Sequence, residues 1–226
     1  MKRRPEAGLT LMEIMIATAI LVTMMALTWR TVGGTIEARR TFESFEERNH
    51  ELRMALDRIV TDFEAAYLSK NEDTNSTNPR TLFVARSGSK LPEIRFSTLG
   101  HRPLWADANE SEQTVIQYLP HDSREHSGQL DWIRREQRRE SNEVPEDQPS
   151  DYDILIRDIA SAKLEYWNWK TLQWQDTWDT TQSDAQKGWL PSRVRITVVV
   201  KSPGGDDYKL MTEARILMQE PLNFTQ

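Results

Sequence analysis

Residues 7–29 read AGLTLMEIMIATAILVTMMALTW, and this stretch decides how the rest of the chain is organised. From Leu9 to Trp29 it holds 21 residues without Pro or Gly and with a single charged side chain, at Glu13. As an α-helix, a stretch of this length extends about 30 Å, which matches the hydrocarbon core of a bilayer. The stretch therefore predicts one membrane-spanning helix near the N-terminus.

The charges around the span predict its orientation. Lys2, Arg3 and Arg4 stand directly before it. Basic residues remain on the cytoplasmic side of a membrane, so residues 1–8 are expected in the cytoplasm and the chain after Trp29 on the opposite side. The bulk of the protein is then expected outside the cytoplasm, anchored by a single pass.

Two ordinary explanations of the span fit less well than a third. A secretory signal peptide with the cleavage motif Ala17-Thr18-Ala19 would have a shorter apolar region, yet the apolar run continues for ten residues beyond Ala19. A plain anchor leaves Glu13 unexplained. A carboxylate inside the membrane costs roughly 2.5–3.5 kcal/mol on insertion scales, so it marks a functional residue that needs a partner.

The segment Gly8-Leu9-Thr10-Leu11-Met12-Glu13 resembles the processing signature of type IV pilins and of the pseudopilins of type II secretion. The resemblance implies that a prepilin peptidase cleaves after Gly8 and that the new N-terminus, Leu9, is methylated. It also implies that Glu13, the fifth mature residue, acts in subunit assembly. The family usually has Phe or Met at the first mature position, so Leu9 is a departure from its pattern.

The chemistry of this arrangement is consistent in itself. Cleavage creates a positive amine in an apolar setting, and the carboxylate of Glu13 on a neighbouring subunit can neutralise it. Each charge then removes the cost of desolvating the other. Gly8 suits a cleavage site because a residue without a side chain lets a protease approach the backbone.

An amphipathic helix pattern follows the span. Gly33 and Gly34 lie where the helix leaves the membrane and predict either a flexible joint or a tolerated weak point, since two glycines cost about 2 kcal/mol of helix stability. The pattern then predicts a helical continuation over residues 30–69 that buries one face against the protein's own sheet, with a coiled coil as the alternative. The residues of that face are Phe42, Phe45, Asn49, Leu52, Leu56, Ile59, Phe63 and Tyr67.

Residues 70–226 show patterns of strand length and predict a globular, β-rich domain. Polar loops are expected at 70–79 and at the acidic, proline-bearing segment 140–152. We expect strands at 81–85, 94–98, 114–119, 129–135, 163–169, 193–201 and 208–218, with 172–178 as a partner strand and 154–159 as a short helix or strand. The fold class is therefore α+β: a long N-terminal helix packed on a mainly antiparallel sheet, as in the type IV pilin-like fold.

Tryptophans gather in the segment LEYWNWKTLQWQDTW, residues 164–178. Trp167, Trp169, Trp174 and Trp178 could form part of a sheet core or a surface that binds a protein partner, because large aromatic residues dominate both settings. The placement of these aromatics, of Leu190-Pro191 and of the final hairpin resembles the C-terminal half of the J-type minor pseudopilins.

Composition and motifs argue against several other functions. The chain has 29 basic and 35 acidic residues and a net charge of -6, which disfavours a nucleic-acid partner. It has no Cys, its four histidines form no metal-type pair, and it contains no G-x-S-x-G, P-loop or dinucleotide fingerprint. We therefore expect no enzyme activity, no cofactor and no metal site.

The resemblance to J-type minor pseudopilins implies a structural role in the tip of a short periplasmic pseudopilus. The partners it implies are the I-, K- and H-type minor subunits, the G-type major subunit, the prepilin peptidase and the inner membrane. Two alternatives remain open at this stage. One is a minor pilin of a type IV pilus or a competence system, and the other is a periplasmic binding domain on an ordinary anchor.

Overall fold

The computed structural model describes residues 10–71, 79–101, 112–138, 152–201 and 205–224. The chain divides into two compact units, residues 1–48 and residues 49–226. The first unit contains most of helix α1 (Leu11–Glu64), and the second contains its last turns and every described strand.

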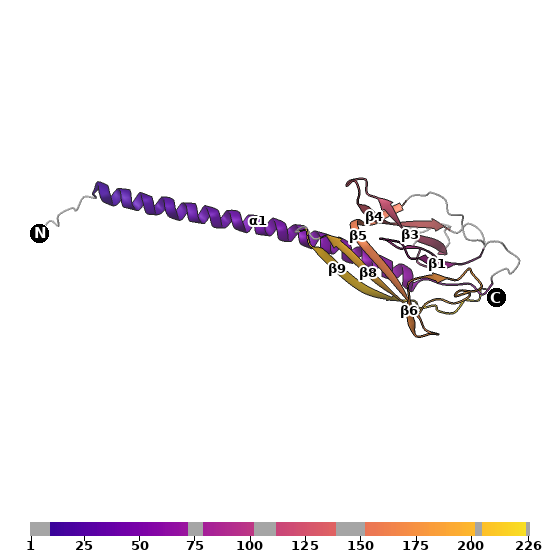
Figure 1. The fold of residues 1–226 in the computed structure, drawn as a ribbon. Coiled ribbons are helices and arrows are strands. Elements are labelled where there is room, and N and C mark those ends of the chain that lie inside the picture. Colours follow the sequence, from indigo (N-terminus) through magenta and orange to yellow (C-terminus); the bar gives the residue numbers. More distant parts are fainter. Residues whose placement is uncertain (1–9, 72–78, 102–111, 139–151, 202–204, 225–226) are drawn as a thin grey trace, which may run out of the picture. The chain divides into compact units, whose positions relative to one another are not determined.

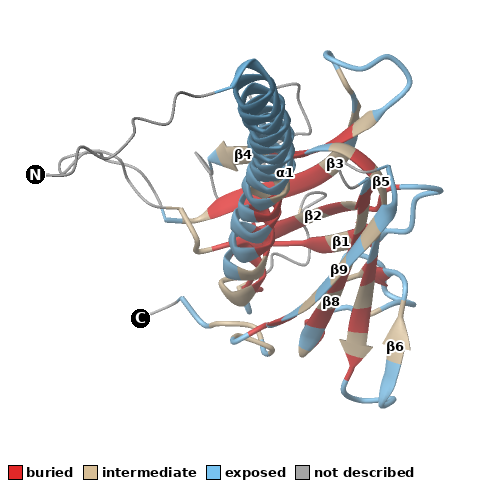
Figure 2. Ribbon diagram, turned by 90° about the vertical axis from the view of Figure 1, so that its left-hand side faces the viewer, coloured by how far each residue is buried: buried red, intermediate tan, exposed pale blue. Residues whose placement is uncertain are grey.

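The part of α1 in the first unit is exposed along most of its length, as the pale blue ribbon in Figure 2 shows, and only Phe45 and Arg48 near its end are half-buried. Thr10 precedes the helix and caps it, because its hydroxyl accepts a hydrogen bond of 3.3 Å from the backbone N–H of Glu13. The helix passes through Gly33 and Gly34 without a break. These two glycines therefore do not end it.

The part of α1 in the second unit is the buried helix of the core. From Asn49 onward the predicted apolar face is buried, as expected for a helix that packs on its own sheet. Phe42 belongs to the first unit and is exposed. The buried helical residues are Asn49, Leu52, Ala55, Leu56, Ile59, Asp62 and Phe63.

The helix ends at Glu64, five residues before the predicted end at Ser69. The reason is that the next residues pair with strands instead. The backbone N–H of Tyr67 donates to the carbonyl of Ser97, and Leu68 accepts from the N–H of Leu222. Tyr67 and Leu68 are buried, so the apolar pattern predicted the burial of Tyr67 correctly but not its extended conformation.

The strands form one antiparallel sheet of nine strands in the second unit (Figure 1). Their order is β7-β1-β2-β3-β4-β5-β8-β9, and β6 pairs with β5 beside this path. The bounds are β1 Phe83–Arg86, β2 Glu93–Thr98, β3 Thr114–Asp122, β4 Leu130–Arg138, β5 Tyr152–Asn168, β6 Gln173–Gln175, β7 Trp178–Asp179, β8 Arg193–Lys201 and β9 Asp207–Arg215.

Strand β5 differs from the prediction of two separate elements at 154–159 and 163–169. It is one strand of 17 residues, whose first half pairs with β4 and whose second half pairs with β8. A bulge lies between Ile159 and Ser161, next to Asp158 with its φ of 46°. The extra residue bends the strand and joins the two halves of the sheet, whereas the sequence pattern suggested an interruption.

The predicted partner strand at 172–178 is also divided. Its first part, β6, pairs with the end of β5, and its second part, β7, crosses to the far edge of the sheet and pairs with β1. The acidic segment predicted as a loop at 140–152 lies outside the described residues except for Tyr152, which begins β5.

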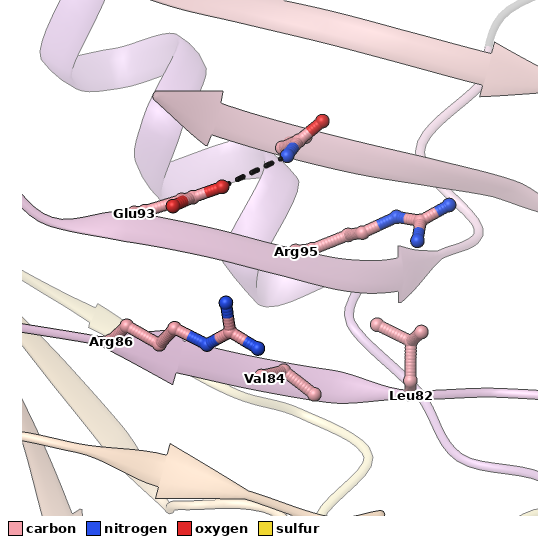
Figure 3. A pocket seen from close by; sticks show the side chains of 6 residues that line it. Leu82, Val84, Arg86, Glu93 and Arg95 are labelled. Atoms are coloured by element: carbon pink, nitrogen blue, oxygen red, sulfur yellow. Dashed lines mark hydrogen bonds between the residues drawn. The ribbon is translucent and has the colours of Figure 1, made fainter. Parts of the chain in front are cut away.

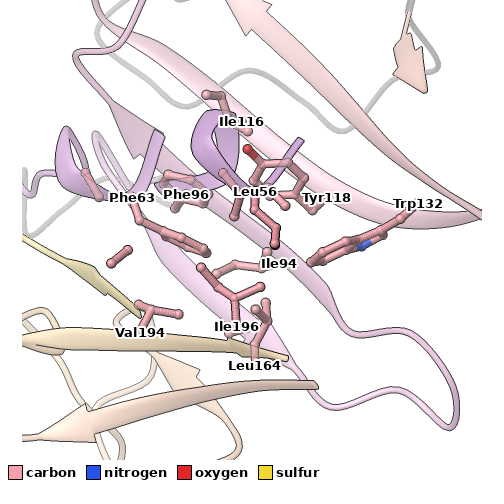
Figure 4. Packing of buried hydrophobic residues seen from close by; sticks show 14 of the residues in the cluster. Leu56, Phe63, Ile94, Phe96, Ile116, Tyr118, Trp132, Leu164, Val194 and Ile196 are labelled. Carbon is pink, nitrogen blue, oxygen red and sulfur yellow. The ribbon is translucent and has the colours of Figure 1, made fainter. Parts of the chain in front are cut away.

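The core lies between the buried part of α1 and one face of the sheet (Figures 2 and 4). Aromatic rings form its centre. Phe63 of α1 stacks on Phe96 of β2 with ring centroids 4.9 Å apart, and the rings of Phe83 and Tyr118 lie 6.3 Å from that of Phe63. The predicted fold class, a long helix followed by a mainly antiparallel sheet, is confirmed.

Candidate assembly site

The predicted processing site is only partly visible. Gly8 and Leu9 lie outside the described residues. Glu13 is described: it occupies the first turn of α1 and its side chain is exposed. An acid in the first turn interacts favourably with the helix dipole, so Glu13 has a local stabilising role as well as the predicted role in assembly.

The helix after Glu13 presents apolar side chains around its whole circumference. Leu11 is 78% exposed and Trp29 is 79% exposed, and the large residues between them are exposed as well. Among the described residues, α1 is the one helix long and apolar enough to cross a membrane. A helix that is apolar all round and unburied in its own protein requires lipid or other helices as its surroundings.

The four predicted tryptophans do not form one surface. Trp178 is a core residue, 1% exposed, and its indole N–H donates a 3.3 Å hydrogen bond to the carbonyl of Trp189. Of the two alternatives, a sheet core or a partner surface, Trp178 belongs to the core, because β7 crosses to the edge beside β1 and carries this ring inward.

Trp167 and Trp174 lie on the opposite face of the sheet from the core and pack edge to face, with centroids 5.3 Å apart. The guanidinium of Arg193 lies over the ring of Trp167 at 5.3 Å, and that of Arg195 lies over Trp174 at 4.0 Å. The cross-strand register explains the contacts, because Trp167 is opposite both Trp174 on β6 and Arg193 on β8. We call these four residues the Trp–Arg stack.

Acidic side chains hold the arginines of the stack in place. Arg195 donates through Nε to Glu213 on β9 at 3.0 Å, and its Nη1 lies 3.8 Å from Glu165 on β5. Glu165 also accepts from Lys163 at 2.9 Å. Tryptophan and arginine dominate binding energy at protein interfaces, and side chains already fixed in place lose little entropy on binding.

Trp169 belongs to a separate aromatic pair. Its ring meets that of Trp189 at 5.6 Å, edge to face, and its N–H donates to the carbonyl of Leu190 at 3.2 Å. The ammonium of Lys170 lies 4.1 Å from the centroid of the Trp189 ring. Trp169 is 37% exposed whereas Trp189 is half-buried, so Trp169 is the more accessible ring of this pair.

An ionic cluster that the sequence did not predict joins α1 to the sheet. Asp62 of α1 is 1% exposed and accepts hydrogen bonds from Tyr118 Oη at 2.5 Å and from Arg134 Nε at 2.6 Å. Arg134 also donates to Glu136 at 2.8 Å, and Glu136 lies 2.6 Å from Nδ1 of His101. The one available signal was that Asp62 interrupts the apolar face of the helix.

The cluster shifts the pKa values of its members. Burial raises the pKa of Tyr118 well above its usual value, and the charge of Asp62 adds to this effect. Burial would lower the pKa of Arg134, but the hydrogen bond and charge of Asp62 outweigh it and raise the pKa. Burial would raise the pKa of Glu136, but Arg134 and then His101 lower it. The folded state therefore favours the charged forms of Arg134 and Glu136 and the neutral form of Tyr118.

A shallow pocket of about 160 Å³ lies on the outer face of β1 and β2 (Figure 3). Its walls include Arg86, Glu93 and Arg95, and Glu93 accepts a 3.2 Å hydrogen bond from Gln117. Within the described ranges, no three His, Asp or Glu side chains converge as metal ligands. His121 contacts Tyr152 and His126 contacts Asp158, so these two histidines have different partners.

Comparison with known proteins identifies the family. The profile of the family described as type II secretion system (T2SS), protein J matches residues 30–205. No curated protein sequence matches the chain significantly.

Two solved structures are similar in fold. A chain of the GspK-GspI-GspJ complex from the type 2 secretion system of enterotoxigenic Escherichia coli shares 17% identity, with a TM-score of 0.46, over 74% of this chain and 97% of that one. The type IV-like pilin TTHA1219 from Thermus thermophilus shares 10% identity, with a TM-score of 0.47, over 74% of this chain and 94% of that one.

The family match covers the end of the apolar helix, the buried part of α1 and every strand as far as β8. It does not include the processing segment, which was recognised independently from residues 8–13. This chain therefore belongs to the protein J family of the type II secretion system.

Proposed function

We propose that the chain is a minor pseudopilin that assembles with other pseudopilins at the tip of a periplasmic pseudopilus. The observation that carries the proposal is the family match over residues 30–205. The partners are the I-, K- and H-type minor subunits and the G-type major subunit. The GspK-GspI-GspJ complex, to which the fold is similar, is an assembly of this kind.

The N-terminal segment supplies the anchor. Residues 9–29 span the inner membrane once, with residues 1–8 in the cytoplasm and the strands in the periplasm. The exposed apolar helix and the basic residues before it support this placement. The prepilin peptidase removes residues 1–8 by cleavage after Gly8, and Leu9 becomes the methylated N-terminus.

Glu13 then guides entry into the growing assembly. Its carboxylate, exposed in the first turn of α1, neutralises the N-terminal amine of a neighbouring subunit. Opposite charges within hydrocarbon attract strongly because little water screens them. The contact forms only when a second subunit is present, so it favours assembly over the isolated chain.

The globular part determines which neighbours are accepted. Two features support the Trp–Arg stack as one such surface: its rings are partly exposed, and its arginines already lie beside Glu213 and Glu165. Trp169 is a further exposed ring, outside the stack. The role of the chain is structural, since assembly through helices and surfaces requires no catalytic group.

Intact-mass spectrometry of the native protein tests the processing step. We expect a chain that lacks residues 1–8 and carries one added methyl group, and a full-length chain in cells without prepilin peptidase. A native chain that begins at Met1, or one cut near Ala19, would contradict the proposal.

Co-purification tests the role of Glu13. Glu13→Ala should insert and fold as the wild type does, but should be lost from the complex with the I- and K-type subunits. Glu37→Ala is the matched control, because Glu37 is also an exposed acid of α1 but lies beyond the span. Equal recovery of both variants in the complex would refute the assembly role.

A further inference from the structure

Strand β9 forms a long open edge of the sheet. It pairs with β8 along all nine residues from Asp207 to Arg215, and it stands last in the strand order (Figure 1). Within the described parts of the chain, β8 is the one strand that pairs with it. In an edge strand every second residue turns its backbone N–H and C=O away from the sheet. These groups can pair with a strand of another chain.

This edge lacks the features that usually block an edge strand, which are a proline, a bulge or a charged side chain on the inner face. Strand β9 has the sequence DYKLMTEAR, without proline, and its register with β8 is regular throughout. Its alternate, inward-facing residues are all uncharged: Tyr208, Leu210, Thr212 and Ala214. The strand is therefore suited to accept another strand at its side.

The two acids on the outer face of β9 are matched within the protein's own sheet. Glu213 stands opposite Arg195 and accepts its 3.0 Å hydrogen bond. Asp207 stands opposite Lys201. Opposite charges that face each other across two strands stabilise the pair. These acids therefore need no further partner.

The two cations on the same face of β9 are not matched in this way. Lys209 stands opposite Val199. Arg215 stands opposite Arg193, and like charges directly opposite each other are destabilising. In the described part of the chain, no carboxylate lies within ion-pair distance of Lys209 or Arg215. The edge thus carries two cations for which the sheet supplies no acid.

An exposed apolar side chain lies between these cations. Met211 is 63% exposed, an unusual position for a large apolar residue in the middle of a strand. The residue opposite it on β8 is Thr197, whose short side chain leaves the methionine uncovered. An apolar side chain on an added strand would remove this surface from water.

These positions specify the chemistry of an added strand. Its residues opposite Lys209 and Arg215 would be acids, and its residue opposite Met211 would be apolar, because such cross-strand pairs are favourable. The residues between them would face inward beside Tyr208 and Leu210, which pack against the core cluster, and would be uncharged. The expected partner is therefore a strand with two acids spaced as Lys209 and Arg215 are.

A second copy of β9 does not fit this description. Two copies anchored in one membrane have their α1 helices in the same direction, so a symmetric pair of β9 strands would be parallel and aligned. Lys209 would then face Lys209, and Arg215 would face Arg215, which is destabilising. The expected occupant is therefore a different chain.

We propose that β9 accepts an edge strand of another minor pseudopilin, which extends the sheet and places acids opposite Lys209 and Arg215. This inference rests on the proposed function, because it takes a pseudopilin as the neighbour, and it adds the contact and the chemistry that join the two chains. The Trp–Arg stack lies on the same face, with Arg193 directly opposite Arg215, so one partner can contact both.

Amide hydrogen exchange at single-residue resolution tests the pairing. In the isolated full-length protein in detergent, every second amide of β9 should exchange rapidly, because β8 does not bond it. In the complex with the I-, K- and H-type subunits, those amides should slow by roughly tenfold or more, whereas the amides already bonded to β8 should change little. Side-chain contact alone would not produce this alternation.

The possible outcomes separate this inference from the proposed function. A complex in which the alternate amides of β9 still exchange rapidly would overturn the strand pairing and leave the proposed function intact. If no complex forms, the proposed function fails and this inference fails with it. Slow exchange along all of β9 in the isolated protein would mean that this chain or a second copy covers the edge, and would also overturn the inference.

Charge reversal tests the predicted acids of the partner. Lys209→Glu and Arg215→Glu should each weaken binding of the minor subunits by roughly three- to tenfold, because an attractive cross-strand pair becomes repulsive. Lys187→Glu is the matched control, since Lys187 is an exposed lysine between β7 and β8, outside the edge, and it should bind as the wild type does. Unchanged binding of the two β9 variants, or equal weakening of all three, would overturn the inference.

Discussion

The ion pair between Asp62 and Arg134 offers the sharpest test of how the helix is held on the sheet. Arg134 is 3% exposed, and its Nε donates to Asp62 at 2.6 Å while Nη1 donates to Glu136 at 2.8 Å. The change to test is Arg134→Leu, which keeps an apolar side chain of moderate size at this position but removes both hydrogen bonds and the charge.

The expected loss follows from what remains around Asp62. Breaking a buried ion pair by removal of one partner costs about 3–5 kcal/mol, because the other charge stays buried without compensation. Here Tyr118 still donates to Asp62, and the partly exposed Arg58 lies 3.4 Å away. We therefore expect a loss near the lower limit, about 3 kcal/mol, or a fall in Tm of roughly 6–12 °C for a domain of this size.

Denaturant unfolding followed by tryptophan fluorescence measures this loss, since Trp132 and Trp178 are buried in the core. The double variant Asp62→Asn/Arg134→Leu removes both charges, and it should be less destabilised than the sum of the two single variants. A loss of less than about 1 kcal/mol in Arg134→Leu, or strict additivity, would refute the view that this buried pair joins α1 to the sheet.

Three further outcomes follow from the structure. The pKa of Glu136 is lowered in the folded state, so its pairing with Arg134 and His101 contributes stability that is lost as the pH falls below 4.5. The denaturant midpoint of the wild type should therefore drop below this pH. The midpoint of Glu136→Gln should drop by a smaller amount over the same range. Phe63→Ala should cost about 3–5 kcal/mol in denaturant unfolding because it empties the aromatic centre of the core, whereas Met54→Ala on the exposed face should stay within about 0.5 kcal/mol. Arg195→Ala should lower the free energy of unfolding by about 0.5–1 kcal/mol, because it removes the contact of the guanidinium with Trp174. It should also weaken recovery of the I- and K-type partners in pull-downs. An unchanged pull-down would contradict the role of the stack.

The candidate site was only partly predictable from the sequence. The processing motif and the span were recognisable because residues close in the chain carry the whole signal. The Trp–Arg stack was half predicted: the tryptophans stood out, but Arg193 and Arg195 lie some twenty residues away and become neighbours only through the register of β5 with β8. The sequence left Trp178 open between core and partner surface, and the crossing of its segment to the opposite edge of the sheet places it in the core.

The sequence by itself determined the elements with a local cause: the apolar span, the buried face of α1 from Asn49, and most strands, because the period of apolar residues depends only on nearby positions. Only the tertiary structure decided where those elements meet. Asp62 and Arg134 lie 72 residues apart, and a bulge makes β5 a single bent strand. Strand β9 becomes an open edge because the topology leaves it last in the sheet. Such contacts depend on which faces pack together, and no local pattern encodes that.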